Sequence, residues 1–193
     1  MLEMRVFQLE SRHSMYIELD PPPENSQISL FLLKPDHVTF EYVSWLNDPQ
    51  VNQYLECRFI KHTVESTRNF VETALESPNY LFFGIKSHLS NQHVGNIKIG
   101  PIDNNHGLGE IGIMIGDKKA WGKGIGSLAI NMVTEIARSQ LLLRKATAGC
   151  YVSNIASQRV FKKNGFLIDA MRKQHFLLNG KPEDAVFMTK NLR

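Results

Sequence analysis

The 193-residue chain is poor in cysteine, in long apolar runs and in charge of one sign. Its two cysteines, Cys57 and Cys150, lie far apart and form no C-x-x-C pair. This spacing argues against a disulfide framework, a zinc site and a redox motif. We therefore expect two free thiols in a reducing compartment and no bound metal.

Apolar runs long enough to cross a bilayer are also missing, because none approaches the roughly 20 residues that this requires. The first residues carry Glu3 and Glu10 and lack the uninterrupted apolar core of a signal peptide. The 22 basic and 19 acidic residues give a net charge of only +3, with Lys and Arg scattered along the chain. We expect a cytoplasmic protein with no membrane or nucleic-acid partner, although this charge allows a small anionic ligand.

The chain has no internal repeat or low-complexity tract, and its one clear break is the proline run in ELDPPPENSQ, residues 18–27. We interpret residues 1–26 as an N-terminal extension with a short strand at MRVFQLE. This extension either covers an edge of the main domain or is loose. Residues 27–193 are expected to form one domain.

Strand and helix patterns alternate through this domain. Helices are expected at PDHVTFEYVSWLND with Pro35 near its start, at TVESTRNFVETALES, after Gly122, and at NIASQRVFKKNG, which Gly165 closes. Strands are expected at ISLFLLK, YLFFGIKS, HVGNIKIGPID, GEIGIMIG, KATAGCYV, FLIDAMRKQHFLL and DAVFMTKNL, the second and third forming a hairpin. This order predicts a mixed α/β (α+β) fold, a central sheet flanked by helices.

The strand GEIGIMIG, residues 109–116, has an informative alternation, because successive side chains of a strand point to opposite faces. Its isoleucine face should lie under a helix, and its other face should leave open space. The isoleucine face carries Ile111, Ile113 and Ile115, and the other carries Glu110, Gly112 and Met114.

Three glycines follow this strand at alternate positions, Gly122, Gly124 and Gly126, immediately before an apolar helical stripe. The first turn of a helix offers unpaired amides and a positive dipole end, and glycines let an oxyanion approach them. The spacing fits neither a P-loop nor a dinucleotide fingerprint. A plain glycine-rich turn is the alternative, although a turn needs only one or two glycines.

Together, WGKGIG and the downstream NIASQRVFKKNGF resemble the GNAT superfamily of acetyl-CoA-dependent N-acetyltransferases, in its RimJ/RimL-like branch. The pyrophosphate loop of that family matches Gly124 and Gly126. Its second motif matches Asn154, Ser157, Lys163, Gly165 and Phe166. Trp121 departs from the Gln or Arg of the superfamily loop, which removes one side-chain contact. The resemblance implies a GNAT fold with a mostly antiparallel sheet, in which the strand before the loop bulges and splays from the next.

The resemblance also implies how acetyl-CoA, the co-substrate, is held. The backbone of Met114 and Ile115 would pair with the pantetheine arm, and the Met114 amide would face the thioester oxygen. Asn154 would bind the pantetheine amides, cap its helix, or do both. Lys163 would approach the adenosine phosphates or lie on a solvated helix face. The amides expected to hold the pyrophosphate are those of Gly122, Lys123, Gly124, Ile125, Gly126 and Ser127.

For the chemistry, the resemblance implies direct attack of a primary amine on the thioester, without an acyl-enzyme. Glu110 would remove the proton of the amine through water, or be a solvated carboxylate at a strand end. The tyrosine that many members use as the acid is replaced by Phe161, so Ser157 is the candidate donor, unless it merely contacts backbone. Further candidates are Tyr151 and Cys150, whereas His106 and His175 are expected at the surface.

The acceptor is left open between a nucleotide-linked amino sugar and a protein or peptide N-terminus, both compatible with the resemblance. The alternative to an enzyme is a non-catalytic acyl-CoA-binding module or sensor. A homodimer through an exposed strand edge is possible but not required. The side chains expected to shape the acceptor end, some of them ordinary core, are Phe31, Trp45, Tyr54, Arg58 and Phe59.

Overall fold

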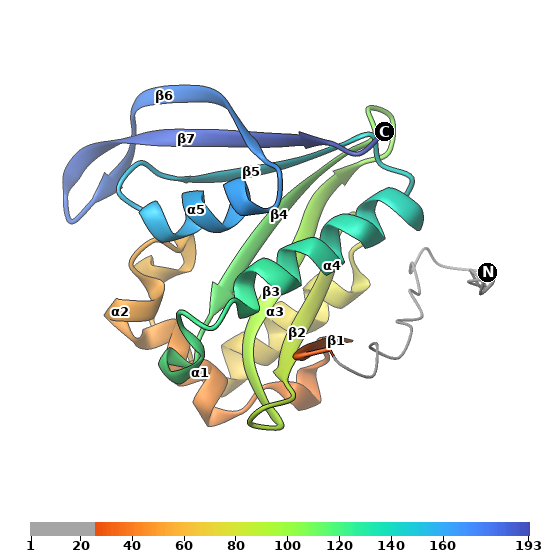
Figure 1. Cartoon of the computed structure of the whole chain (residues 1–193). Helices are drawn as coiled ribbons and strands as arrows, with labels where there is room; N and C mark the ends of the chain where they lie inside the picture. The colour runs from red at the N-terminus through yellow and green to blue at the C-terminus, as the bar shows by residue number, and fades with distance from the viewer. Residues whose placement is uncertain (1–25) are drawn as a thin grey trace.

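The computed structural model describes residues 26–193, so the strand expected at MRVFQLE lies outside the described residues. The described chain forms a seven-stranded sheet in the order β1-β2-β3-β4-β5-β7-β6, with helices on both faces (Figure 1). The strands are β1 (Ile28–Leu32), β2 (Leu81–Ser87), β3 (Gln92–Asp103), β4 (Leu108–Ile115), β5 (Lys145–Tyr151), β6 (Leu167–Leu178) and β7 (Lys181–Asn191). The helices are α1 (Phe40–Asn47), α2 (Pro49–Asn52), α3 (Val64–Glu76), α4 (Ile125–Ser139) and α5 (Ile155–Lys163), with short 3₁₀ turns η1 (Pro35–His37), η2 (Glu56–Phe59) and η3 (Lys118–Ala120).

All neighbouring strands are antiparallel except β4 and β5, which confirms the predicted mixed sheet. The parallel pair is short, since Leu108–Glu110 pair with Lys145–Thr147 and the strands then part. Figure 1 shows β4 and β5 diverging toward α2, α5 and the first turn of α4. The predicted splay is therefore confirmed, and it opens toward the glycine-rich turn.

The bulge expected in β4 is not there. β4 pairs regularly with β3 from Ile111 to Ile115, and the register shift lies in β3 between Ile99 and Ile102. β3 advances three residues where β4 advances two, so the extra residue belongs to β3. The alternation of side chains along β4 is consequently preserved from Ile111 to Ile115, where β4 still pairs with β3 but has parted from β5.

The two faces of the sheet carry separate apolar clusters. Ile111 lies in the core that β2, β3 and β5 share with α4 and α5, and Ile113 and Ile115 pack against it. Met114 lies in the opposite cluster, with Trp45 and other residues of α1. The isoleucine face is thus covered as predicted. The expected open space on the other face is partly filled, because Lys98 and Trp45 occupy the places of side chains at Gly112 and Gly116.

Helix boundaries follow their capping residues. The single helix expected from Pro35 is split into η1 and α1, because Thr39 caps α1 and accepts a hydrogen bond from the Tyr42 amide. The expected helix at 64–76 begins at a Thr63–Ser66 capping box. On α4, Leu128 is 38% exposed, whereas Ile130 is buried. Within residues 26–193, no helix is long and apolar enough to cross a membrane.

His93 is a titratable group packed against the second apolar cluster, the one that contains Met114 and Trp45. Its ring contacts Phe31, Tyr42 and Trp45 edge-on, and its Nε2 lies 2.9 Å from both the Gly95 carbonyl oxygen and Asn96 Oδ1. Both partners are acceptors, so Nε2 carries the proton and the ring fits this site in its neutral form. Burial lowers the pKa of His93, and these hydrogen bonds only partly oppose the effect.

This lowered pKa predicts that acid destabilises the fold. The unfolded chain takes up a proton at His93 near pH 6.5, where the folded chain still resists it. Stability from this site is therefore complete above about pH 7 and is lost as the pH falls through 6.5 toward the lower pKa of the folded state. His93→Gln, which keeps an N–H donor, is expected to show a smaller loss of urea midpoint between pH 7.5 and pH 5.5 than the unchanged protein. Equal losses in the two proteins would contradict this role.

Candidate active site

The glycine-rich turn lies between η3 and α4 and leaves its backbone bare. Gly122 and Gly124 have φ angles of +73° and +78°, and a Cβ atom at either would meet nothing within 4 Å. Gly124 caps α4, whose first-turn amides have no partner within the helix. At Gly126 a Cβ would contact Ile113 and Val160 at 3.7 Å, so this glycine allows close packing of the helix. The positions open to a ligand are thus two of the three glycines.

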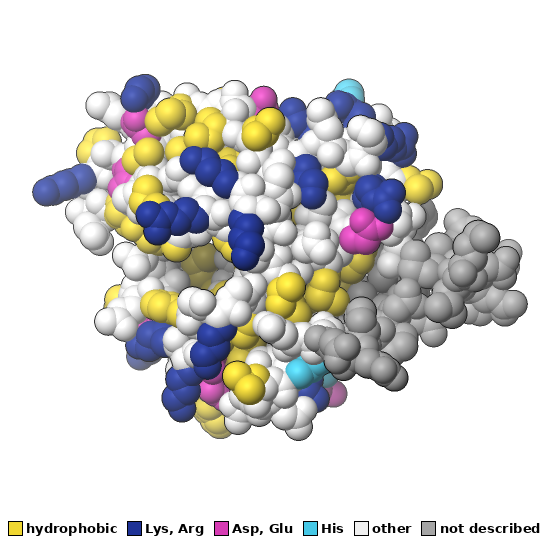
Figure 2. Space-filling view, in the orientation of Figure 1, with side chains coloured by type: hydrophobic (Ala, Val, Ile, Leu, Met, Phe, Trp, Pro, Cys, Tyr) yellow, Lys and Arg dark blue, Asp and Glu magenta, His cyan; other side chains and the backbone are white. Residues whose placement is uncertain are grey.

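A cleft of about 630 Å³ runs from this turn along the parted end of β4. Figure 2 shows a hollow with an apolar floor on this face, with Lys and Arg side chains above it. Lys123 and Glu110 of the predicted site do not line the cleft. The predicted residues that do are Met114, Ile115, Gly122, Gly124, Ile125, Gly126, Ser127, Asn154, Ser157 and Lys163.

Two cations of α5 line the cleft, Lys163 and Arg159. Lys163 was predicted from the sequence, and Arg159 was missed. The signal for Arg159 is its position four residues before Lys163, because residues i and i+4 lie on one face of a helix. Together they make the α5 wall of the cleft attractive to phosphate.

The backbone of β4 presents alternate amides to the two neighbouring strands. The Gly116 amide donates to the Val94 carbonyl, and Met114 pairs with Asn96, so the amide of Met114 faces β3. Ile115 faces the other way, since its carbonyl accepts a 2.8 Å hydrogen bond from Trp121 Nε1. The amides of Ile113 and Ile115 therefore face the parting gap. This geometry disfavours the Met114 amide as the group at the thioester and favours Ile113.

Asn154 and Ser157 lie at the start of α5. The Asn154 side chain accepts a 3.1 Å hydrogen bond from the Ser157 amide, which confirms its capping role, and it also lines the cleft. Ser157 lies beside Cys150, whose thiol is buried. Burial raises the pKa of the Cys150 thiol, and the Ser157 hydroxyl lowers it by a smaller amount. The Ser157 hydroxyl is thus a polar group at the wall of the cleft.

Comparison with known proteins gives the family. The family model described as an acetyltransferase (GNAT) domain matches residues 29–167. The chain belongs to the GNAT acetyltransferase family. It is an N-acetyltransferase that takes the acetyl group from acetyl-CoA, and the non-catalytic module is set aside.

Relatives of this GNAT protein agree on the family. It is 29% identical over 127 residues to a probable N-acetyltransferase of Bacillus subtilis, YjcK, covering 64% of this chain and 70% of the relative. A spermidine N-acetyltransferase of Vibrio cholerae, solved with CoA and spermine, superposes with a TM-score of 0.78 at 19% identity, covering 87% of this chain and 97% of that one. A probable acetyltransferase superposes with a TM-score of 0.75 at 23% identity, covering 86% and 94%. At these identities the solved structures show the fold, and the RimJ/RimL-like branch stays a prediction.

The described residues of this GNAT protein fit acetyl-CoA. Open space in front of Gly122 and Gly124 leaves room for a diphosphate beside bare amides. Cations on α5 lie along the same cleft, and gap-facing amides of β4 continue it. A metal site is not supported in residues 26–193, since no three His, Cys, Asp or Glu side chains there are grouped to hold an ion.

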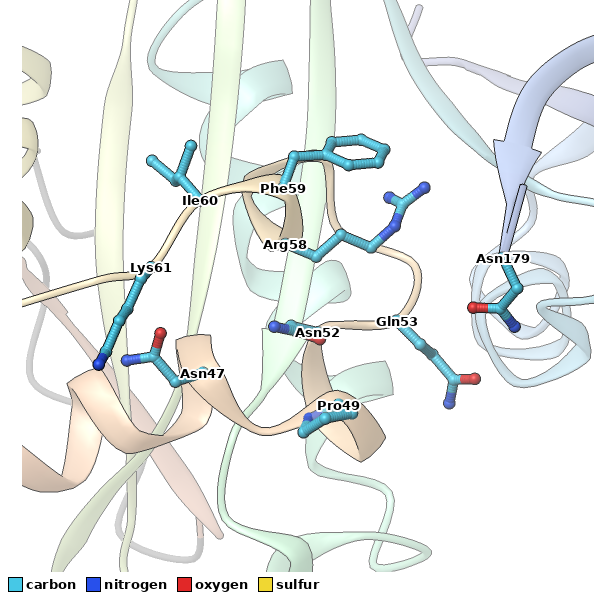
Figure 3. A pocket seen from close by; sticks show the side chains of 9 residues that line it. All are labelled: Asn47, Pro49, Asn52, Gln53, Arg58, Phe59, Ile60, Lys61 and Asn179. Carbon is cyan, nitrogen blue, oxygen red and sulfur yellow. The ribbon is translucent and has the colours of Figure 1, made fainter.

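A second pocket of about 640 Å³ adjoins the cleft of the GNAT protein, because Gln53 lines both. Figure 3 shows Lys61 and Asn47 on one side of it, Gln53 and Asn179 on the other, and Pro49 below. Arg58, Phe59, Ile60 and Asn52 complete the lining. Of the residues expected at the acceptor end, Arg58 and Phe59 lie here and Tyr54 lines the cleft. Phe31 and Trp45 pack with the second apolar cluster.

A polar cluster lies between the second pocket and the sheet. Arg58 Nη2 donates to Tyr151 Oη at 2.7 Å, and Tyr151 Oη donates to Glu56 Oε1 at 2.7 Å. Tyr151 is buried and stacks on Phe176, with ring centroids 4.3 Å apart. Sequence reasoning gave Glu56 no role, because the contact joins residues 95 positions apart.

Proposed function

We propose that this acetyltransferase modifies the primary amine of a nucleotide-linked amino sugar. The observation that carries the proposal is the lining of the second pocket. It holds two cations, Arg58 and Lys61, together with four carboxamides and no carboxylate. Such a lining suits phosphates and sugar hydroxyls, because cations pair with phosphate and carboxamides both donate and accept hydrogen bonds. The pocket meets the cleft at Gln53, so an acceptor held there would reach the gap.

The groups of the chain would then divide the work. The amides and cations of the cleft would hold acetyl-CoA, which supplies a thioester activated for attack. The Ile113 amide, which faces the gap, would stabilise the charge that develops on the thioester oxygen. Ser157 would donate a proton to the departing sulfur. Glu110 lies about 10 Å along β4 from Ile113, three residues away in the paired part of the strand, and would act only through water.

A polyamine is the acceptor named for the Vibrio cholerae structure. Polyamines are polycations at neutral pH, and Lys61 would repel them from the second pocket, whereas the charge of Arg58 is paired with Glu56. We therefore expect polyamines to be poor substrates here.

A peptide or protein N-terminus is the second candidate. Phe59 and Ile60 line the second pocket and are 67% and 64% exposed, so they offer an apolar surface to a peptide side chain. A peptide bound to this apolar surface would offer Lys61, a basic side chain of the pocket, no anionic group to pair with. We therefore rank the amino sugar first.

An acceptor panel tests the proposal. Protein and acetyl-CoA are mixed with UDP-amino sugars, N-terminal peptides and spermidine, and release of free thiol is followed. The expected result is a kcat/KM for one UDP-amino sugar at least about 100-fold above that for spermidine. The reason is that the positive charge of the second pocket attracts the phosphates of the sugar nucleotide and repels the polyamine. Lys61→Glu should erase most of this preference while thiol release stays measurable. Spermidine as the best substrate would contradict the proposal, and preferred turnover of peptides would support the second candidate.

A further inference from the structure

The face of the sheet that carries Glu110 is the face opposite α4 and α5. Cys150, Ala148 and Ala146 of β5 point into the α4–α5 core, so by alternation Tyr151 points to the Glu110 face. Tyr151 and Glu110 therefore flank the gap on one side of the sheet, the side opposite α4 and α5. An acceptor amine that attacks from this side meets one of them or a group that they hold.

Tyr151 and Glu110 lie at different positions along the gap between β4 and β5. In the parallel pair, Glu110 lies beside Thr147. Continued along both strands, this register sets Cys150 and Tyr151 beside Ile113 and Met114. The gap-facing amide of Ile113 is thus level with the Tyr151 cluster, and Glu110 lies about 10 Å lower. At the height of the predicted thioester site, Tyr151 holds a carboxylate, that of Glu56.

Glu56 is held in a defined position but remains accessible. Tyr151 Oη donates to its Oε1 at 2.7 Å, and Arg58 Nη1 lies 3.4 Å from the same oxygen. Its side chain is 64% exposed, whereas that of Arg58 is 12% exposed. The flanking residues line both hollows, Leu55 the cleft and Arg58 the second pocket. Glu56 itself lines neither hollow, but it lies between these two residues in the chain and its exposed carboxylate is open to an incoming ammonium group.

We propose that Glu56, rather than Glu110, is the catalytic base that deprotonates the acceptor amine, with Tyr151 and Arg58 as positioning residues. The proposal rests on the proposed function above, in which a primary amine attacks the thioester in the gap between β4 and β5. One proton passes from the ammonium to the Glu56 carboxylate. The nitrogen lone pair then forms the C–N bond and the C–S bond breaks. The nitrogen loses a second proton as the amide forms, and the departing sulfur gains one, so the charges balance. Glu56 returns its proton to solvent, which it reaches because it is exposed.

The charged and titratable groups around Glu56 are Arg58, Tyr151 and Cys57. Burial is the largest cause of the raised pKa of Tyr151, and its hydrogen bond to Glu56 adds to it. Tyr151 thus stays protonated at neutral pH and donates to Glu56. Removing its hydroxyl is expected to release the Glu56 carboxylate from its defined position, since the hydrogen bond that holds it is lost.

The test compares the variants Glu56→Gln and Glu110→Gln, using the best amine of the acceptor panel as substrate. Glu72→Gln is the control, because Glu72 is an exposed carboxylate on α3. We expect Glu56→Gln to lower kcat/KM at pH 7 by about 100-fold or more. The loss should shrink toward pH 9.5, where the free amine is abundant. Affinity for acetyl-CoA, measured by calorimetry, should stay within about twofold, because Gln still accepts from Tyr151. Tyr151→Phe should lower kcat, because Glu56 loses the hydrogen bond that positions it, while KM for the amine and affinity for acetyl-CoA stay within about twofold.

Three results would overturn the role of Glu56 alone, and a fourth would overturn the proposed function with it. Wild-type kcat/KM in Glu56→Gln would remove Glu56, and a pH-dependent loss found only in Glu110→Gln would return the role to Glu110. An equal loss at every pH, together with weakened acetyl-CoA binding, would make Glu56 a structural residue. Absence of turnover with every amine would overturn the proposed function and this proposal together. Turnover of a peptide in place of an amino sugar would leave the test of Glu56 intact.

Discussion

Replacing Gly124 with valine is expected to lower the affinity for acetyl-CoA by at least about 100-fold, the equivalent of two lost charge-assisted hydrogen bonds. The free protein has room for the side chain, since nothing lies within 4 Å of a Cβ at this position. The loss comes from the space that a diphosphate would need in front of the first-turn amides of α4. Calorimetric titration with acetyl-CoA gives the affinity, and thermal unfolding shows that the variant is folded.

Backbone strain is the main confounding effect. Gly124 has a φ of +78°, where a β-branched residue is strained by about 1–2 kcal/mol. Gly180 offers a matched control, because its φ is +76° and it also has nothing within 4 Å. Gly180→Val should lose similar stability and keep its affinity for acetyl-CoA. Equal affinities of the two variants would show that the turn does not hold the co-substrate.

Gly95→Ala is expected to lower the free energy of unfolding by about 2–3 kcal/mol, at the upper end for overpacking. A Cβ at Gly95 would lie 2.4 Å from the Met114 carbonyl oxygen and 3.0 Å from the Ile115 Cα, both backbone atoms of β4. Backbone atoms of a paired strand cannot move aside as a flexible side chain can. β4 must therefore shift, and affinity for acetyl-CoA should fall as well, because these residues line the cleft.

Gly126→Ala is the comparison for stability. Its Cβ would make only ordinary contacts, the nearest at 3.7 Å, and it lies within α4. Alanine is favoured over glycine in a helix by up to about 1 kcal/mol, so this variant should equal or exceed the unchanged protein. Urea unfolding of both variants measures the difference. A Gly95→Ala variant as stable as Gly126→Ala would show that β3 and β4 do not approach as closely as described.

Much of the fold follows from local patterns. The alternation of isoleucines in β4, the helical pattern of TVESTRNFVETALES and the glycines before α4 were each sufficient to place an element, because each signal is local in the chain. The split of η1 from α1 depends on Thr39, a capping residue that a continuous helical pattern hides. The register shift in β3 has no comparable local signal, since it depends on which residues of two strands are paired.

The candidate site divides in the same way. Asn154, Ser157 and Lys163 were predicted from the resemblance of NIASQRVFKKNGF to a family motif, and they line one cleft because they follow one another along α5. For Met114, a bulge was expected where β4 pairs regularly with β3, and the amide of this residue faces β3. Glu56 was missed because its partner Tyr151 comes from β5, and only the folded sheet brings them together.

The central claim is that bare amides of residues 122–127 hold a diphosphate and that the coenzyme arm lies between β4 and β5. A crystal structure with bound CoA tests this most directly. The expected result is a diphosphate in front of Gly122 and Gly124, with the pantetheine arm bonded to the backbone of Ile113 and Ile115. CoA found outside the gap, or first-turn amides of α4 bonded only within the protein, would contradict the account.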